Sequence, residues 1–136
     1  MVEQNENMKT ETKIRYYKNG KIEYKYDYVN GEKHGECIDY DRDGNIHLKI
    51  DFVYGERHGE FIEYYENGNV REKTDYVNGR PHGKSTIYYC NGQIMGETEY
   101  VNGNRCGKHT SYDEFGFCEF RCEIDANGNY NVSEKW

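Results

Sequence analysis

Residues 64–83 read Tyr-Tyr-Glu-Asn-Gly-Asn-Val-Arg-Glu-Lys-Thr-Asp-Tyr-Val-Asn-Gly-Arg-Pro-His-Gly. Two Asn-Gly pairs, Asn67-Gly68 and Asn78-Gly79, enclose a run that contains valine, threonine and tyrosine. These three residue types are enriched in strands, whereas asparagine and glycine tolerate the left-handed backbone of tight turns. The stretch therefore predicts one β-strand held between two turns.

The same short motifs recur along the chain with a period of 24 residues. Tyr76-Val77-Asn78-Gly79 repeats Tyr28-Val29-Asn30-Gly31 and returns again as Tyr100-Val101-Asn102-Gly103. Three glycine series keep this period, and their members are Gly20, Gly44, Gly68, Gly92 and Gly116; Gly31, Gly55, Gly79 and Gly103; Gly35, Gly59, Gly83 and Gly107. A fixed period of this length is typical of a tandem array of small structural units.

Each unit contains a run in which apolar and charged residues alternate. Every second residue from Ile22 to Tyr28 is apolar or aromatic, and the residues between them are charged. Residues Ile46 to Phe52 place an apolar residue at every second position in the same way. A period of two indicates a β-strand, and the density of glycine disfavours a helix.

The turn that ends in Gly20 is expected to be a three-residue loop with the glycine in the left-handed conformation. This loop would pair Tyr16 with Ile22 and Ile14 with Tyr24, and so gather apolar side chains on one face. A two-residue loop would slip the register by one residue and set Arg15 opposite Tyr24.

A longer link, Asn30 to Gly35, is expected to return the chain to the next unit, and Pro81 falls in the equivalent link of the third unit. The resulting fold class is all-β: a single elongated, twisted antiparallel meander sheet of about ten strands, built from about five tandem β-hairpins. We expect the array to span residues 11–127, after a flexible segment of residues 1–10. Residues 128–136 are expected to form a capping segment with a terminal strand from Asn131, because the last repeat has no neighbour to cover its edge.

Aromatic residues recur in columns across the expected sheet. The candidate partner-binding columns are Tyr16, Tyr40, Tyr64, Tyr88 and Tyr112; and Tyr28, Phe52, Tyr76 and Tyr100. A single sheet with one apolar face must bury it by coiling, by packing on a second copy or by accepting a partner. Tyrosine suits a partly solvent-exposed position, because its hydroxyl can keep a polar partner while its ring is buried.

Composition narrows the class of partner. The formal net charge is −7, and an acidic surface repels nucleic acid and anionic lipid. No apolar run reaches about 18 residues, and the first ten residues show no signal peptide, so we expect a cytoplasmic protein. The five cysteines show no framework spacing and fit a reducing compartment.

The sequence offers no constellation of residues typical of catalysis, and we expect neither enzymatic activity nor a cofactor. His34, His58 and His82 share one repeat position, where packing in a turn is a simpler role than metal binding. Cys118 and Cys122 lie ~13 Å apart along one strand, too far for a disulfide or for direct ligation of one ion.

The motif Tyr-Tyr-x-Asn-Gly followed by Tyr-Val-Asn-Gly-x-x-His-Gly resembles the MORN-repeat variant family, over roughly Glu11 to Asn127. The resemblance implies a non-enzymatic β-hairpin array that acts in protein–protein interaction or as a scaffold, with a second copy as one candidate partner. Some members are described as antitoxins that neutralise a bacterial toxin, which the acidic charge would suit. The related MORN repeat is associated with phosphoinositide binding, but the charge makes a membrane partner the weaker alternative.

Overall fold

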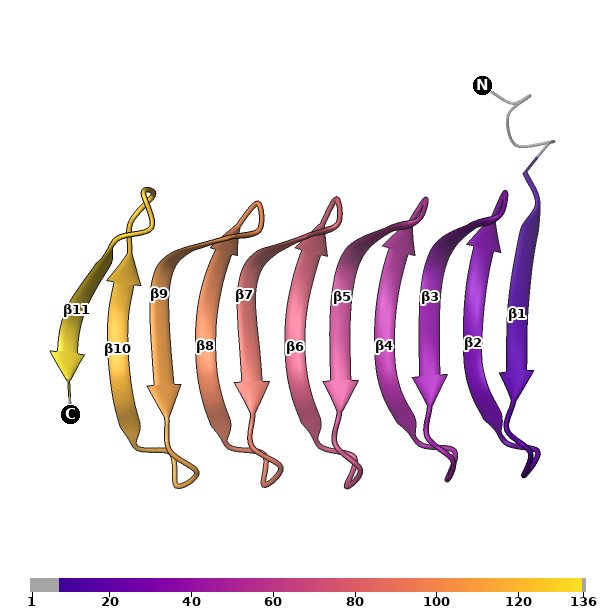
Figure 1. Ribbon diagram of the computed structural model, residues 1–136, viewed down its shortest axis with the longest axis horizontal. Helices are drawn as coiled ribbons and strands as arrows, with labels where there is room; N and C mark the ends of the chain where they lie inside the picture. The colour runs from indigo at the N-terminus through magenta and orange to yellow at the C-terminus, as the bar shows by residue number, and fades with distance from the viewer. Residues whose placement is uncertain (1–7, 136) are drawn as a thin grey trace.

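The computed structural model describes residues 8–135, which form one antiparallel sheet (Figure 1). Its strands are β1 (Thr10–Tyr16), β2 (Ile22–Val29), β3 (Glu32–Tyr40), β4 (Ile46–Val53), β5 (Glu56–Tyr64), β6 (Val70–Val77), β7 (Arg80–Tyr88), β8 (Ile94–Val101), β9 (Asn104–Tyr112), β10 (Cys118–Ile124) and β11 (Tyr130–Lys135). The described residues include no helix long and apolar enough to cross a membrane.

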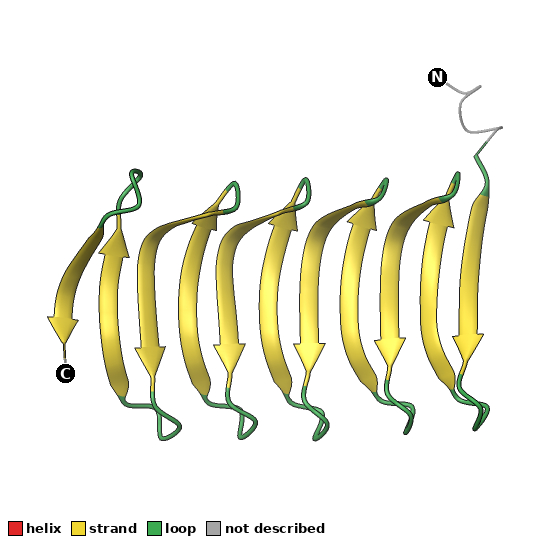
Figure 2. Cartoon of the chain, in the orientation of Figure 1, coloured by secondary structure: helices red, strands yellow, loops and turns green. Residues whose placement is uncertain are grey.

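The strands lie side by side in their chain order, from β1 to β11. Figure 2 shows the turns gathered along the two long edges of this row. The end strands β1 and β11 do not pair with each other, so the sheet stays open rather than closing on itself. The expected all-β meander of hairpin repeats is confirmed, and β11 is the terminal strand that covers β10. The expected flexible segment lies mostly in residues 1–7, outside the described part of the chain.

One edge, which we call the turn edge, carries the three-residue loops expected from the sequence. In the first hairpin the amide of Tyr17 donates to the carbonyl of Lys21 at 2.8 Å, which closes a loop over Lys18, Asn19 and Gly20. The φ angle of Gly20 is 87°, a left-handed conformation that glycine adopts at little cost. The side chain of Asn19 accepts from the Lys21 amide at 2.9 Å and ties the loop down.

The opposite edge, which we call the link edge, differs from the expectation. The expected long link from Asn30 to Gly35 is wrong, because β3 already begins at Glu32. Asn30 and Gly31 alone connect β2 to β3, with φ angles of 50° and 80°. Two successive positive φ angles define a type I′ turn, whose twist matches the flanking strands. Gly35 (φ 95°) lies inside β3 at an irregular register, and Pro81 likewise lies inside β7.

The register near the turn edge also departs from the expectation. Tyr16 pairs with Ile22 as expected, but the next pair is Arg15 with Tyr24 rather than Ile14 with Tyr24. A β-bulge at Glu23 inserts one extra residue, and the same irregularity recurs in every hairpin at the turn edge. The loop hydrogen bonds fix the pairing at the tip, and the neighbouring strands fix it further along. The bulge absorbs the one-residue difference between them.

This bulge changes which side chains share a face. Because alternation is interrupted at Glu23, the cross-strand pair of Tyr16 and Ile22 lies on the face opposite Tyr24 and Tyr26. The expectation that the Tyr16 column and the Tyr28 column share one face is therefore wrong. The expectation assumed that side chains alternate between the two faces along the whole strand, and the single bulge in each hairpin interrupts this alternation.

The sheet is one layer thick along its whole length. The accessible surface is 9407 Å², about a quarter more than the roughly 7,500 Å² typical of a compact monomer of 16.2 kDa. Buried apolar residues occur on both sides, and Ile38 and Ile62 belong to the face of Lys25, Lys49 and Lys73. These isoleucines pair with lysines across the strands, so aliphatic lysine stems cover them.

The turn glycines allow a direct test of the backbone constraint. Gly68→Ala should destabilise the protein by roughly 1–2 kcal/mol in urea unfolding, because φ is 89° there and alanine disfavours this conformation. No atom lies within 4 Å of the added Cβ, so a steric clash would not explain the loss. Gly96→Ala is the control, since Gly96 lies in β8 without a positive φ and an added Cβ would lie 3.4 Å from the Thr110 carbonyl oxygen, so it should lose less stability than Gly68→Ala. Equal losses in both variants would contradict the prediction.

Candidate functional site

One side of the sheet carries a continuous run of aromatic and aliphatic side chains, and we call it the aromatic face. It carries Tyr24, Tyr26, Tyr28, Leu48, Ile50, Phe52, Phe61, Tyr76 and Tyr100. The face is set by register: Tyr26 pairs with Cys37, Cys37 with Ile50, and Ile50 with Phe61. The nine residues come from β2, β4, β5, β6 and β8, and Cys37 of β3 lies between Tyr26 and Ile50 in the same row, so consecutive hairpins build one continuous surface.

Cations cover the aromatic rings near the link edge. The Lys33 ammonium lies 4.6 Å from the ring centroid of Tyr26 and 5.2 Å from that of Phe52. The Arg57 guanidinium lies 5.4 Å from Tyr76 and 5.6 Å from Phe61. These distances suit cation–π attraction. The aromatic face is therefore amphipathic, with rings beneath and positive groups above them.

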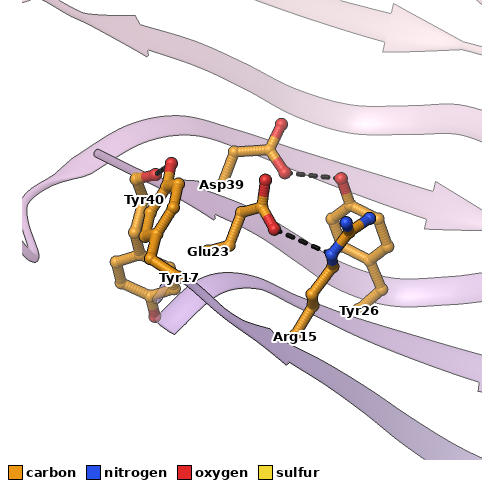
Figure 3. Close-up of polar contacts among 6 residues, drawn as sticks. All are labelled: Arg15, Tyr17, Glu23, Tyr26, Asp39 and Tyr40. Carbon is orange, nitrogen blue, oxygen red and sulfur yellow. Dashed lines mark hydrogen bonds and ion pairs between the residues drawn. The ribbon is translucent and has the colours of Figure 1, made fainter. Parts of the chain in front are cut away.

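A small polar cluster orders the start of this face (Figure 3). The Tyr26 hydroxyl donates to Asp39 Oδ1 at 2.5 Å, and the rings of Tyr24 and Tyr26 stack with centroids 4.3 Å apart. Burial, and then the Asp39 carboxylate, raise the pKa of Tyr26 well above its ordinary value of 10.0. The hydroxyl consequently remains a donor and holds both rings upright on β2.

The aromatic character fades toward the C-terminal half. The same row continues through Thr74, Ser85, Thr98 and His109. The hydroxyls of Thr74 and Ser85 are 2.7 Å apart, and Thr98 Oγ1 lies 2.7 Å from His109 Nδ1. Paired polar groups replace apolar ones here, so the aromatic part of the face is densest over β2 to β6.

The two predicted aromatic columns lie on different faces of the sheet. Tyr28, Phe52, Tyr76 and Tyr100 all lie on the aromatic face near the link edge, opposite Lys33, Arg57, Pro81 and Arg105 respectively. The other column lies at the turn edge on the opposite face, the one that carries Lys25, Lys49 and Lys73; it consists of Tyr16, Tyr40, Tyr64, Tyr88 and Tyr112. Tyr16 is 58 % exposed at the end strand, whereas the others are half-buried between neighbouring hairpins. The structure thus brings together only the Tyr28 column with the aromatic face.

The repeated histidines hold the link edge together. Nδ1 of His34 accepts from the amide of Tyr54 at 3.1 Å. His58 and His82 accept from the amides of Asn78 and Asn102 at 3.3 Å. This confirms the expected role in turn packing. Among the described residues no group of three histidine, cysteine or acidic side chains is placed to hold a metal ion.

Sequence reasoning missed a ladder of tyrosines at the turn edge. The hydroxyls of Tyr17, Tyr65 and Tyr89 donate to the carbonyls of Tyr40, Tyr88 and Tyr112, at 2.6–2.8 Å. Each bond spans 23 residues and joins one turn to the next. Figure 3 shows the contact between Tyr17 and Tyr40. The signal was present in the Tyr-Tyr doublets at 16–17, 64–65 and 88–89, of which only the first tyrosine was used.

Comparison with known families accounts for this regularity. The profile of the MORN repeat variant family matches residues 12–30, 33–54, 57–78 and 81–102, more than half of the chain. The chain belongs to the MORN repeat variant family. The four matches end before Cys106, so the fifth unit of this MORN repeat variant array is outside the profile although it keeps the hairpin geometry. No curated protein matches the chain.

The tyrosine ladder should contribute measurably to stability. Tyr65→Phe removes the donor to the Tyr88 carbonyl and should cost about 0.5–1.5 kcal/mol in urea unfolding. Tyr16→Phe is the matched control, because Tyr16 is exposed on the end strand and should change stability by less. If the two variants had the same free energy of unfolding, the Tyr65 hydrogen bond would make no net contribution to stability.

Stability should depend on pH through His109. Burial, and then the nearby Arg105 charge, lower the pKa of His109 below its ordinary value of 6.5. The folded state therefore binds fewer protons than the unfolded chain, so stability is full above pH 6.5 and decreases as the pH falls below it. His109→Gln should flatten the dependence of the unfolding free energy between pH 7 and about 5.5.

Proposed function

We propose that this chain is a non-enzymatic protein-binding module, and that its aromatic face over β2 to β6 contacts the partner. The partner is another protein or a second copy of the chain. The proposal rests on one observation: half-buried aromatic side chains form a continuous surface on a one-layer sheet, and no second layer of described residues packs on it.

The composition of the face supports a protein partner. Tyrosine, phenylalanine and arginine are enriched where protein interfaces are strongest, because they combine large area with hydrogen-bonding ends. Here Tyr76 and Phe61 lie under Arg57, and Tyr26 and Phe52 lie under Lys33. Stacking and cation–π contacts hold these side chains in place before binding, which reduces the entropy lost on association.

Charge weighs against other partner classes. The formal charge of −7 repels phosphate backbones and anionic headgroups. The same charge favours a basic protein by electrostatic complementarity. An inhibitor of a basic toxic enzyme would be one case of this function, with the same face engaged.

Affinity capture with matched variants tests the proposal. The tagged chain would be used as bait in its native lysate, alongside Phe52→Ser/Tyr76→Ser and the control Lys49→Ser/Lys73→Ser. Each pair lies on β4 and β6, but on opposite faces. We expect a stoichiometric protein partner whose affinity, measured on the purified complex, falls at least tenfold with the aromatic variant and changes little with the lysine variant.

Sedimentation of the purified variants completes the test. Recovery of the bait alone, with a dimer that Phe52→Ser/Tyr76→Ser dissociates, would identify the partner as a second copy. A partner that binds the aromatic variant as well as the original chain would refute the assignment of this face. Thermal unfolding of both variants shows whether a lost interaction reflects a lost fold.

A further inference from the structure

Side-chain hydrogen bonds join neighbouring turns at most junctions of the turn edge, and two of these bonds recur at each bridged junction. Turns on this edge are two strands apart, or ~10 Å. The Tyr65 hydroxyl crosses that distance to the Tyr88 carbonyl, and Asn67 Nδ2 donates to the Cys90 carbonyl at 2.7 Å. Tyr89 and Asn91 join the next turn in the same way, as do Tyr17 and Asn19. The recurring residue pair is therefore a tyrosine and an asparagine two positions later.

The second turn lacks both members of this pair. Asp41 stands at the tyrosine position and Asp43 at the asparagine position. The Asp41 carboxylate turns back on its own loop, where Oδ1 accepts from the amides of Asp43 and Asn45 at 2.9 Å. A short acidic side chain can neither reach the next turn nor donate. The carbonyls of Tyr64 and Glu66 are consequently left without the donors that their counterparts receive.

The position of this exception is informative. Asp113 makes the same loop-capping bonds in the fifth turn, to the amides of Phe115 and Phe117. Within residues 8–135 no sixth turn lies on that edge, because β11 is the last strand of the described sheet. An aspartate at position 113 therefore omits no bridge, whereas Asp41 omits one between two adjacent turns.

A hollow occupies the place of the missing bridge. It measures about 420 Å³ and we call it the turn notch. Tyr17, His47 and Tyr65 are among its lining residues, so the hollow is bordered by the first three turns of this edge. The Arg42 guanidinium lies over the Tyr17 ring and that of Arg71 over the Tyr65 ring, at 5.7 and 5.6 Å from the centroids. This volume falls within the range of sites that hold small organic groups.

We propose that the turn notch binds a tyrosine side chain of a partner protein, flanked in that protein by a basic residue. The other junctions indicate which group fits the notch, because at three of them a tyrosine of the chain bridges the two turns. A guest phenol would donate to the Tyr64 carbonyl, as Tyr65 does to that of Tyr88. The tyrosines that line the notch, Tyr17 and Tyr65 among them, match a planar aromatic guest in polarity.

Charge specifies the flanking residue. Asp41, Asp43 and Glu66 all border the notch. Hydrogen bonds from the loop amides lower the pKa of Asp41, so its carboxylate is charged at neutral pH. Arg42 lies over the ring of Tyr17, and the Lys21 ammonium donates to the Asp43 carbonyl at 2.8 Å. Within the described part of the chain, the carboxylates of Asp41, Asp43 and Glu66 form no ion pair with either of these cations. A lysine or arginine next to the guest tyrosine would meet this charge and supply the donor that Asp43 cannot provide to the Glu66 carbonyl.

The notch lies at the turn edge and Phe52 and Tyr76 lie near the link edge, so this inference does not rest on the proposed aromatic-face partner. The test uses ¹⁵N-labelled protein and the capped peptide Gly-Lys-Tyr-Lys-Gly, followed by amide chemical shifts. We expect saturable shifts confined to residues 41–47 and 64–66. The phenylalanine peptide should bind about two- to tenfold more weakly because it lacks the hydroxyl, and the alanine peptide should not bind measurably.

The decisive variant restores the missing tyrosine and asparagine in the second turn, and we call it the repaired turn. Asp41→Tyr/Asp43→Asn rebuilds in the second turn the pattern of Tyr65 and Asn67, so it should abolish peptide binding and raise the thermal midpoint. Asp113→Tyr/Phe115→Asn makes the same change where no turn follows, and should bind the peptide as the original chain does. His47→Trp fills the notch from an exposed position and tests the same point should the repaired variant not fold.

The alternatives give distinct results. Peptide binding that survives the repaired turn, or that produces shifts elsewhere, would overturn the proposal. Equal affinity for the tyrosine and alanine peptides would show that charge alone is responsible. Self-association that the repaired turn abolishes, with no peptide binding, would make a second copy the occupant and would also overturn the proposal.

Discussion

The architecture depends on left-handed backbone placed at fixed intervals on both edges of the sheet. At the turn edge a glycine with φ near 90° recurs every 24 residues, and four links at the opposite edge have two successive residues with positive φ, beginning at Asn30, Tyr54, Asn78 and Asn102. Without these conformations the chain could not reverse within two or three residues. Each strand would then lose the neighbour that satisfies its amides and carbonyls. Asn30 and Gly31 meet this requirement easily, whereas Tyr54, with φ of 44°, meets it at a cost.

A one-layer sheet changes how the remaining residues contribute. Two-layer folds bury an apolar side between elements, but here each hairpin contacts only the hairpins beside it. Burial is therefore local: lysine stems cover Ile38 and Ile62, and cations cover Phe52 and Tyr76. Hydrogen bonds between turns add a second kind of nearest-neighbour contact. Stability in such an array is approximately a sum of unit and junction contributions, and recognition must use the exposed faces and edges.

Periodicity predicted the fold almost completely, because turn glycines and strand alternation are local properties of the sequence. The number of repeats, their order and the three-residue loops all followed from residues such as Gly20 and Tyr16. The side of the sheet on which Tyr16 lies did not follow, because a bulge at Glu23 depends on competition between the loop and the neighbouring strands. The type I′ turn at Asn30-Gly31 was missed because Gly35 was counted with it. The tyrosine ladder was missed because its bonds join residues 23 apart, a distance that strand patterning does not address.

The uneven turn edge also bears on how the array comes apart. Three junctions carry tyrosine and asparagine clamps, but the junction between the second and third hairpins is held at that edge by the pairing of β4 with β5 alone. In a linear array, cooperativity passes from unit to unit through such junctions, and a weaker one separates domains of opening. Asp41 thus marks the weakest junction of the turn edge. We expect the first two hairpins and the last three to open as two separate cooperative units, although the strand pairing is continuous across them.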